Sequence, residues 1–336
     1  MKEISINGNT YRLPNSLNSF QQKMYIHLID WKWQHITREP GSARGSKYDA
    51  ILPDTYSDEF PQIYPAAVPV LKDHLQRFPF RTHKYFNHMA SSQAANVNLF
   101  LPLLNSPEAS AILATIKFDF AELANSELDN GYRIEFWDEP HRNLGDKTEV
   151  SGTDSDIGIS YYNHQGELCL WLIEHKLTES EFTECGGYKS NGRTPKHDCS
   201  KTFMQILQDK QSCYYHDKRK FNYWNITESN QGFFFRHAEH ETCPFRGGMN
   251  QLWRNQLLAM SIEQDDRQPY KHVYFSVVKH QDNHHLNETL TAYQHMIDGA
   301  PSFSIFTSAD VVNAVQEMGG AGLSHWVDWY RRLYRL

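Results

Sequence analysis

Residues 152–176, GTDSDIGISYYNHQGELCLWLIEHK, contain carboxylates and a lysine at spacings that suit metal-assisted chemistry. Asp156 opens an alternating run, Gly166 marks a turn, and an apolar run then leads to Glu174 and Lys176, which predicts a β-hairpin. Side chains two residues apart in a strand share a face, so Glu174 and Lys176 are expected side by side. A neighbouring strand that begins at Asp156 would bring in a second carboxylate and complete a hard oxygen site suited to Mg²⁺.

Such a site could cleave a phosphodiester bond. Metal ions held by Asp156 and Glu174 would neutralise charge developing on a phosphate and lower the pKa of a bound water. Lys176 would orient that water or stabilise the transition state. Asp154 shares the face of Asp156 and is a candidate accessory ligand. A Glu-X-Lys sequence is also typical of a solvated ion pair at a strand end. The preceding apolar run and the upstream aspartate favour the catalytic interpretation.

At these residues the chain resembles the PD-(D/E)XK nuclease superfamily, which includes many restriction endonucleases and RecB-like nucleases. The resemblance places Asp156 on the first acidic position of the motif, Glu174 on the second and Lys176 on the lysine, with Ser155 where the motif has proline. It implies an α/β fold with a restriction-endonuclease-like core, in which helices flank a mixed central β-sheet. It also implies an endonuclease that cleaves DNA with Mg²⁺ or Mn²⁺, as in defence against phage and other foreign DNA.

A strand predicted at residues 132–137 carries a further candidate carboxylate. Its apolar side chains alternate with Arg133 and Glu135. Many nucleases of the superfamily have an additional acidic residue upstream of the aspartate, so the resemblance makes Glu135 a candidate third metal ligand. An exposed glutamate paired with Arg133 is the alternative interpretation.

The helix predicted at residues 249–264 presents polar side chains on one face, from Gln251, Arg254 and Asn255. In RecB-like nucleases a helix after the catalytic strands presents a glutamine to the active site, and Gln251 resembles that residue. The tyrosine expected four positions later is replaced by Asn255. The resemblance therefore also fits a distinct restriction-type branch.

Residues 180–247 interrupt the nuclease pattern with an insertion rich in Cys, His and basic residues. Residues 185–224 contain eight basic and three acidic side chains, a local charge of +5 in a chain whose net charge is −7. An acidic chain does not bind nucleic acid indiscriminately, so contact must come from a local patch. The predicted nucleic-acid-binding residues are Lys189, Arg193, Lys218, Arg219, Lys220 and, beyond the insertion, Arg254.

Five cysteines occur, and Cys169 lies within the apolar strand as a small hydrophobic residue. The other four lie in the insertion and are candidate ligands for Zn²⁺ or an iron–sulfur cluster: Cys185, Cys199, Cys213 and Cys243. Some RecB-like and CRISPR-associated nucleases hold a four-cysteine iron–sulfur cluster, but with different spacing. No Cys-X₂-Cys pair is present. Unpaired structural cysteines are the alternative.

The chain divides into a mainly helical region at 1–129 and a nuclease core at 130–336 that contains the insertion. Helices are expected around residues 20–31, 65–77, 89–104, 107–123, 249–264 and 308–319, further strands at 271–279 and 303–306, and a loop at 37–62. Gln93 and Asn98 are amides among apolar neighbours, so each needs a partner, either structural or a catalytic carboxylate. The aromatic carboxyl end is expected to pack on the core or on a second subunit.

Bulk composition limits the remaining possibilities. A chain of 336 residues with 40% hydrophobic residues can bury a large core. The amino terminus lacks the apolar core of a signal peptide, and no apolar run approaches the roughly 20 residues of a membrane span, so a cytoplasmic protein is expected.

Several functional alternatives stay open at this stage. One is a nucleic-acid-binding module, organised by a Cys/His metal site, whose nuclease-like core no longer cuts. Another is a metal-dependent hydrolase of a different substrate. The presence of Asp156, Glu174 and Lys176 favours the nuclease. DNA is the expected substrate and RNA an alternative, a homodimer would suit cleavage of both strands, and partner proteins of a defence system are candidates.

Overall fold

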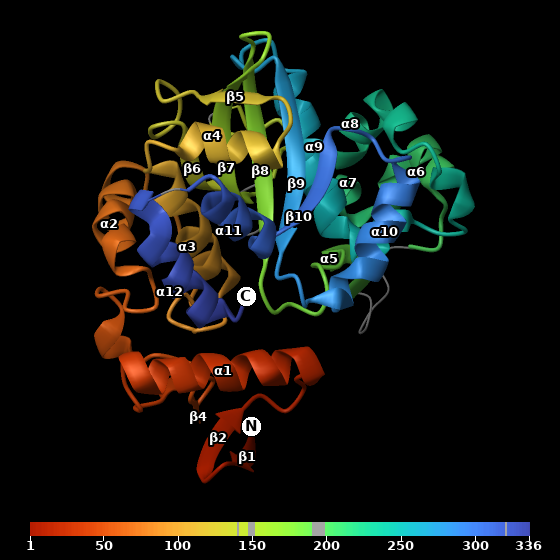
Figure 1. Ribbon diagram of the computed structural model, residues 1–336. Helices are drawn as coiled ribbons and strands as arrows, with labels where there is room; N and C mark the ends of the chain where they lie inside the picture. The colour runs from red at the N-terminus through yellow and green to blue at the C-terminus, as the bar shows by residue number, and fades with distance from the viewer. Residues whose placement is uncertain (140, 147–151, 190–198, 320) are drawn as a thin grey trace.

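The centre of the computed structural model is a six-stranded sheet in the order β10-β9-β8-β7-β5, with β6 also paired to β7 (Figure 1). The structure describes residues 1–139, 141–146, 152–189, 199–319 and 321–336. The strands of this sheet are β5 (Phe120–Leu123), β6 (Tyr132–Phe136), β7 (Ser155–Asn163), β8 (Leu168–Lys176), β9 (His272–Lys279) and β10 (Phe303–Thr307). Strands β8, β9 and β10 run parallel, whereas β7 is antiparallel to β5, β6 and β8. The predicted mixed α/β class with a central sheet is confirmed.

Helices cover both faces of the sheet because its central strands are apolar on both sides. Cys169, Trp171 and Ile173 of β8 belong to one buried cluster, and Leu170 and Leu172 belong to the other. The first cluster includes residues of α2 (Val68–Arg77), α3 (Ser92–Leu104), α4 (Ala109–Ile116), α11 (Ser308–Glu317) and α12 (Ser324–Tyr334). The second includes residues of α9 (Met249–Glu263), α10 (Asn287–Met296) and the insertion. Glu174 and Lys176 continue the face that carries Leu170 and Leu172, and α9 packs on that face.

The insertion is built into the second cluster rather than appended to it. Its short helices are α5 (Gly186–Lys189), α6 (Phe203–Gln208), α7 (Tyr214–Asp217) and α8 (Tyr223–Ser229). Phe245 stacks on Trp253 of α9 with ring centroids 4.3 Å apart, and Trp224 lies 5.3 Å from the same indole. Aromatic contacts of this kind fix the insertion to α9, which packs on the central sheet.

The amino-terminal region is less helical than the sequence predicts. It contains α1 (Ser19–His35) and two hairpins, β1 (Lys2–Ile6) with β2 (Asn9–Leu13) and β3 (Gly41–Ala43) with β4 (Ser46–Tyr48). The second hairpin lies in the segment expected to be a loop. In Figure 1, α1 and the first hairpin lie below the sheet, and α1 contacts α12 of the carboxyl end.

Two further boundaries differ from the prediction. The helix expected through residue 123 ends at Ile116, because Phe120 and Leu123 instead pair with β7 as the edge strand β5 and bury their side chains. The helix expected at residues 308–319 would have Ser308 as its N-cap, but Thr307 caps α11, since its hydroxyl accepts the backbone N–H of Asp310. The aromatic carboxyl end packs on the core, with Trp326 and Leu333 buried. No helix in the described ranges is long and apolar enough to cross a membrane.

Candidate active site

Glu174 and Lys176 lie together at the carboxyl end of β8, as the strand periodicity predicts. The Lys176 ammonium donates a hydrogen bond from Nζ to Glu174 Oε1 at 2.7 Å, and the side chains of Lys176 and Glu174 are only 9% and 5% exposed. This buried ion pair differs from the solvated strand-end pair of the alternative interpretation. A buried pair constrains both charges at one place on the sheet.

Asp156 and Glu135 supply two further carboxylates from neighbouring strands. Asp156 Oδ2 accepts a hydrogen bond from the backbone N–H of His175 at 2.6 Å, which links β7 to the end of β8. Glu135 lies opposite Asp156, between the paired positions Ile134↔Ile157 and Phe136↔Ser155. Its Oε1 accepts a 2.7 Å hydrogen bond from Gln93 Nε2 of α3. The sheet thus brings together the acidic residues that the sequence placed far apart.

Two amides of α9 hold Glu174 from its other side. Gln251 Nε2 donates to Glu174 Oε1 at 2.6 Å, and Asn255 Nδ2 donates to Oε2 at 2.9 Å. The spacing of four residues places both amides on one helix face. Gln251 Oε1 in turn accepts the backbone N–H of Thr183 at 3.1 Å, which fixes its orientation. The structure therefore places Gln251 beside the catalytic glutamate candidate, as the resemblance implies.

The buried amides of α3 divide between the two roles that the sequence allows. Gln93 contacts a site carboxylate, whereas Asn98 binds the backbone of Tyr64 and the hydroxyl of Tyr334. Asn96, which sequence reasoning missed, donates from Nδ2 to the backbone oxygen of Asp156 at 2.9 Å. The only sequence signal for Asn96 was an amide side chain within a predicted helix of mostly apolar residues.

Burial and neighbouring carboxylates raise the pKa values of Asp156, Glu135 and Asp154. Burial and the Glu174 charge raise the pKa of Asp156, and burial and the Asp156 charge raise that of Glu135. The pKa of Asp154 is raised by the surrounding protein and by Glu174, although part of its side chain is open to solvent. Burial opposes the charge of Lys176, yet Glu174 and its neighbours raise the lysine pKa overall. The cluster therefore has a surplus of negative charge.

This surplus fits a divalent cation. Carboxylate oxygens are the ligands that Mg²⁺ prefers, and a cation between them would relieve their repulsion. Among the residues that the structure describes, no group of three or more His, Cys, Asp or Glu side chains forms a ready metal cage. Mg²⁺ commonly uses only one or two protein carboxylates and keeps several waters, so Asp156 and Glu174 match its needs.

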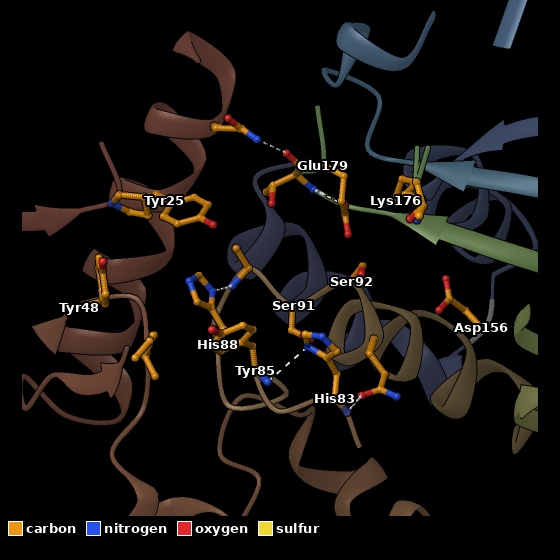
Figure 2. Close-up of a pocket in the computed structure, with 18 of the residues that line it drawn as sticks. Tyr25, Tyr48, His83, Tyr85, His88, Ser91, Ser92, Asp156, Lys176 and Glu179 are labelled. Carbon is orange, nitrogen blue, oxygen red and sulfur yellow. Dashed lines mark hydrogen bonds between the residues drawn. The ribbon is translucent and has the colours of Figure 1, made fainter. Parts of the chain in front are cut away.

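The carboxylates face an open cleft of about 730 Å³. Asp156, Glu174 and Lys176 line it from the sheet, and Thr178 and Glu179 continue that wall beyond β8. Figure 2 shows Asp156 and Lys176 on one side of this space, with labelled tyrosines and histidines on the other. A substrate can therefore reach the acid–lysine cluster from solvent.

Lys218, Arg219, Lys220 and Arg254, the predicted nucleic-acid-binding residues whose side chains the structure describes, do not line this cleft. Lys218, Arg219 and Lys220 are exposed on the insertion, and Lys218 Nζ pairs with Asp217 Oδ2 at 2.8 Å. The Arg254 guanidinium is engaged internally, with Thr153 Oγ1 3.0 Å away and with Gly152 and Tyr223 as further partners. Arg193 and the side chain of Lys189 lie outside the described residues.

The insertion cysteines gather in the second core cluster. Cys185, Cys213 and Cys243 all pack there, and the backbone N–H of Cys185 bonds to the Arg246 oxygen at 3.2 Å. Burial raises the pKa of each of these three thiols. For Cys243 the neighbouring thiols of Cys213, Cys185 and Cys199 raise the pKa further. Backbone N–H groups two and three residues later point at the sulfurs of Cys185 and Cys213.

Together, these features define a mixed α/β protein whose central sheet ends in an acid–lysine cluster at an open cleft. The family described as Restriction Endonuclease associating with ARP matches residues 30–335, and the chain belongs to this family. No curated protein and no solved structure matches the chain. The restriction-endonuclease part of the predicted resemblance is thereby supported, while membership of the PD-(D/E)XK superfamily stays a prediction.

Proposed function

We propose that this protein is a metal-dependent endonuclease that hydrolyses phosphodiester bonds of DNA in defence against foreign DNA. One observation carries the proposal: Asp156, Glu174 and Lys176 converge at the end of the central sheet and line an open cleft. The family of restriction endonucleases to which the chain belongs supports this chemistry.

Each residue then has a distinct task. Asp156 and Glu174 would hold Mg²⁺ or Mn²⁺, with Glu135 and Asp154 as accessory carboxylates. The bound metal would supply charge neutralisation at the phosphate and an activated water. Gln251 and Asn255 orient Glu174 through its two oxygens. Lys176, whose ammonium donates a hydrogen bond to Glu174, would orient the water or stabilise the transition state as a cationic donor.

A partner protein belongs to the same proposal. The family description names association with ARP, so we infer that a protein so designated acts together with this chain. Association could supply the recognition of a DNA site, because the chain shows no helix-turn-helix or other groove-reading motif.

The test is cleavage of plasmid and of linear single-stranded DNA in Mg²⁺, Mn²⁺ and EDTA. Wild-type protein is expected to cut only with metal, and Asp156→Ala and Lys176→Ala to lose at least about a hundredfold in rate. Lys271→Ala is the control, because this exposed lysine bonds to Leu168 at the opposite end of β8. Metal-independent cutting, or full activity in both site variants, would refute the assignment.

A further inference from the structure

The wall of the cleft that faces the catalytic candidates comes from the amino-terminal region. Tyr25 of α1, Arg44 and Tyr48 of the second hairpin, and His83 and Tyr85 of the segment after α2 all line it. In Figure 2, Tyr25, Tyr48, His83 and Tyr85 lie across the open space from Asp156 and Lys176. A substrate bound at the carboxylates would therefore lie beside this wall.

Arg44 occupies a backbone position that an arginine rarely adopts. It forms the turn of the second hairpin with Gly45, and both residues have positive φ, at +48° and +76°. This two-residue turn favours Asn-Gly, and the first hairpin of the same chain uses Asn7-Gly8 with φ of +50° and +81°. An arginine gains nothing for the turn, and strained backbone is commonly retained where function requires it.

Arg44 and Lys84 gather around the ring of Tyr85. Lys84 Nζ lies 4.7 Å from the centroid of the Tyr85 ring. Lys84 and Arg44 also interact with the phenol oxygen and lower the pKa of Tyr85. Arg44 and Lys84 are exposed, and Tyr85 is half-buried. Two cations around an accessible aromatic ring are the chemistry that single-strand-binding surfaces use for phosphates and bases.

We propose that Arg44, Lys84 and Tyr85 form a binding site for an unpaired polynucleotide strand and direct its scissile phosphate toward Asp156 and Glu174. Arg44 and Lys84 contact phosphates, and Tyr85 stacks on a base. Base faces are covered in a duplex, so a tyrosine can stack only on an unpaired or extruded nucleotide. This inference rests on the proposed nuclease function, and it names the substrate strand at the same site.

Binding is measured by fluorescence anisotropy in EDTA, with a labelled single-stranded oligonucleotide and the duplex made from it. Wild-type protein is expected to prefer the single strand. Arg44→Asn gives the second hairpin the same Asn-Gly turn as the first hairpin, so the variant is expected to fold normally. Because it lacks the Arg44 charge, it is expected to bind the single strand several-fold more weakly. It should also reduce the slope of log K against log salt by about 0.7, the loss of one phosphate contact.

Two more variants separate stacking from charge. Tyr85→Leu is expected to weaken single-strand binding about tenfold, whereas Tyr85→Phe, which keeps the ring, should bind like wild type. Lys271→Asn removes an exposed charge at the far end of the sheet and should leave affinity unchanged. Equal losses in Arg44→Asn and Lys271→Asn, no single-strand binding, or tighter duplex binding would overturn the inference.

The outcomes also separate this inference from the proposed function. Single-strand binding that depends on Arg44 and Tyr85, without cutting in Mg²⁺ or Mn²⁺, would retain the strand site and refute the nuclease. Metal-dependent cutting by wild-type protein, with normal single-strand binding by Arg44→Asn and Tyr85→Leu, would support the nuclease and refute the strand site.

Discussion

Glu174 shows how one carboxylate can be held in place by a helix and a lysine at once. Its two oxygens accept hydrogen bonds from Lys176, Gln251 and Asn255. Each donor offsets part of the cost of burying the charge, because a buried carboxylate needs hydrogen bonds or a cation. Replacing one of these donors with an acceptor should therefore lower the free energy of unfolding.

The Asn255→Asp variant tests this balance. The change is nearly isosteric, but it places a second carboxylate against Glu174 Oε2, now 2.9 Å from the amide nitrogen. We expect the free energy of unfolding in EDTA to fall by about 2 kcal/mol, and Mg²⁺ to restore more stability to the variant than to wild-type protein. Urea unfolding with EDTA and with Mg²⁺ measures both effects. Wild-type stability in EDTA would contradict the role given to Asn255.

His88 should make the fold sensitive to acid. Burial lowers its pKa to about 4, and its Nδ1 accepts the backbone N–H of Ala90 at 2.9 Å, which only an unprotonated nitrogen can do. The unfolded ring has a pKa of 6.5, so acid protonates the unfolded state first. This contribution to stability is complete above pH 6.5 and is lost as the pH falls toward 4, on the order of 3 kcal/mol.

His88→Asn keeps an acceptor for Ala90 but cannot be protonated. Its thermal midpoint should therefore depend less steeply on pH between 6.5 and 4 than that of wild-type protein. Parallel curves for the two proteins would show that acid sensitivity resides elsewhere.

At the scale of elements, helices and strands with long apolar patterns could be predicted from the sequence, whereas short strands could not. The helix α9 and the strands β8 and β9 were predicted from long apolar patterns, and the structure confirms these three elements. The β3–β4 hairpin has only three residues in each strand, too few for a periodic pattern. Residues 120–123 form a strand because they pair with β7, and the local sequence does not reveal this pairing.

The same distinction applies to the candidate site. Asp156, Glu174 and Lys176 could be placed from the hairpin pattern, because strand periodicity fixes which side chains share a face. Gln251 was placed through the resemblance. The cleft wall of Arg44 and Tyr85 could not be predicted, since its position depends on how the amino-terminal region packs against the sheet.

The insertion helices are short, and metal binding by the insertion cysteines stays a prediction from the sequence, because no three His, Cys, Asp or Glu side chains of the described residues form a ready metal cage. Cys185, Cys213 and Cys243 lie in one cluster, with Cys199 near enough to affect the Cys243 thiol. We expect purified protein to contain about one Zn²⁺ per chain, bound by these thiolates, and chelation to lower its thermal midpoint. Metal analysis of wild-type protein and Cys213→Ser tests this, with Cys169→Ser as the control cysteine. An iron–sulfur cluster would instead absorb visible light, and metal-free, stable protein would contradict both.

At the scale of the whole molecule, α1 of the amino-terminal region packs against α12 at the carboxyl end of the chain. Trp31 of α1 packs edge-on against Trp329 of α12 at 5.8 Å, and Tyr64 contacts the same indole at 5.3 Å. His27 bonds to the backbone oxygen of Arg332 at 2.8 Å. These contacts attach the amino-terminal region, with its Arg44 hairpin, to the core. The distance between the two walls of the cleft therefore depends on packing far from the carboxylates.

Trp329→Ala should loosen this attachment without altering the acid–lysine cluster. Loss of the two aromatic contacts should lower the free energy of unfolding by about 2 kcal/mol. Amide hydrogen exchange should accelerate in α1 more than in β8, because the amino-terminal region would open before the sheet does. Phe118→Ala removes an aromatic ring that is 81% exposed and should change neither measurement. Equal acceleration of exchange in α1 and β8 would instead mean that the amino-terminal region and the sheet open as one unit. Trp329 would then stabilise the whole fold and would not set the width of the cleft.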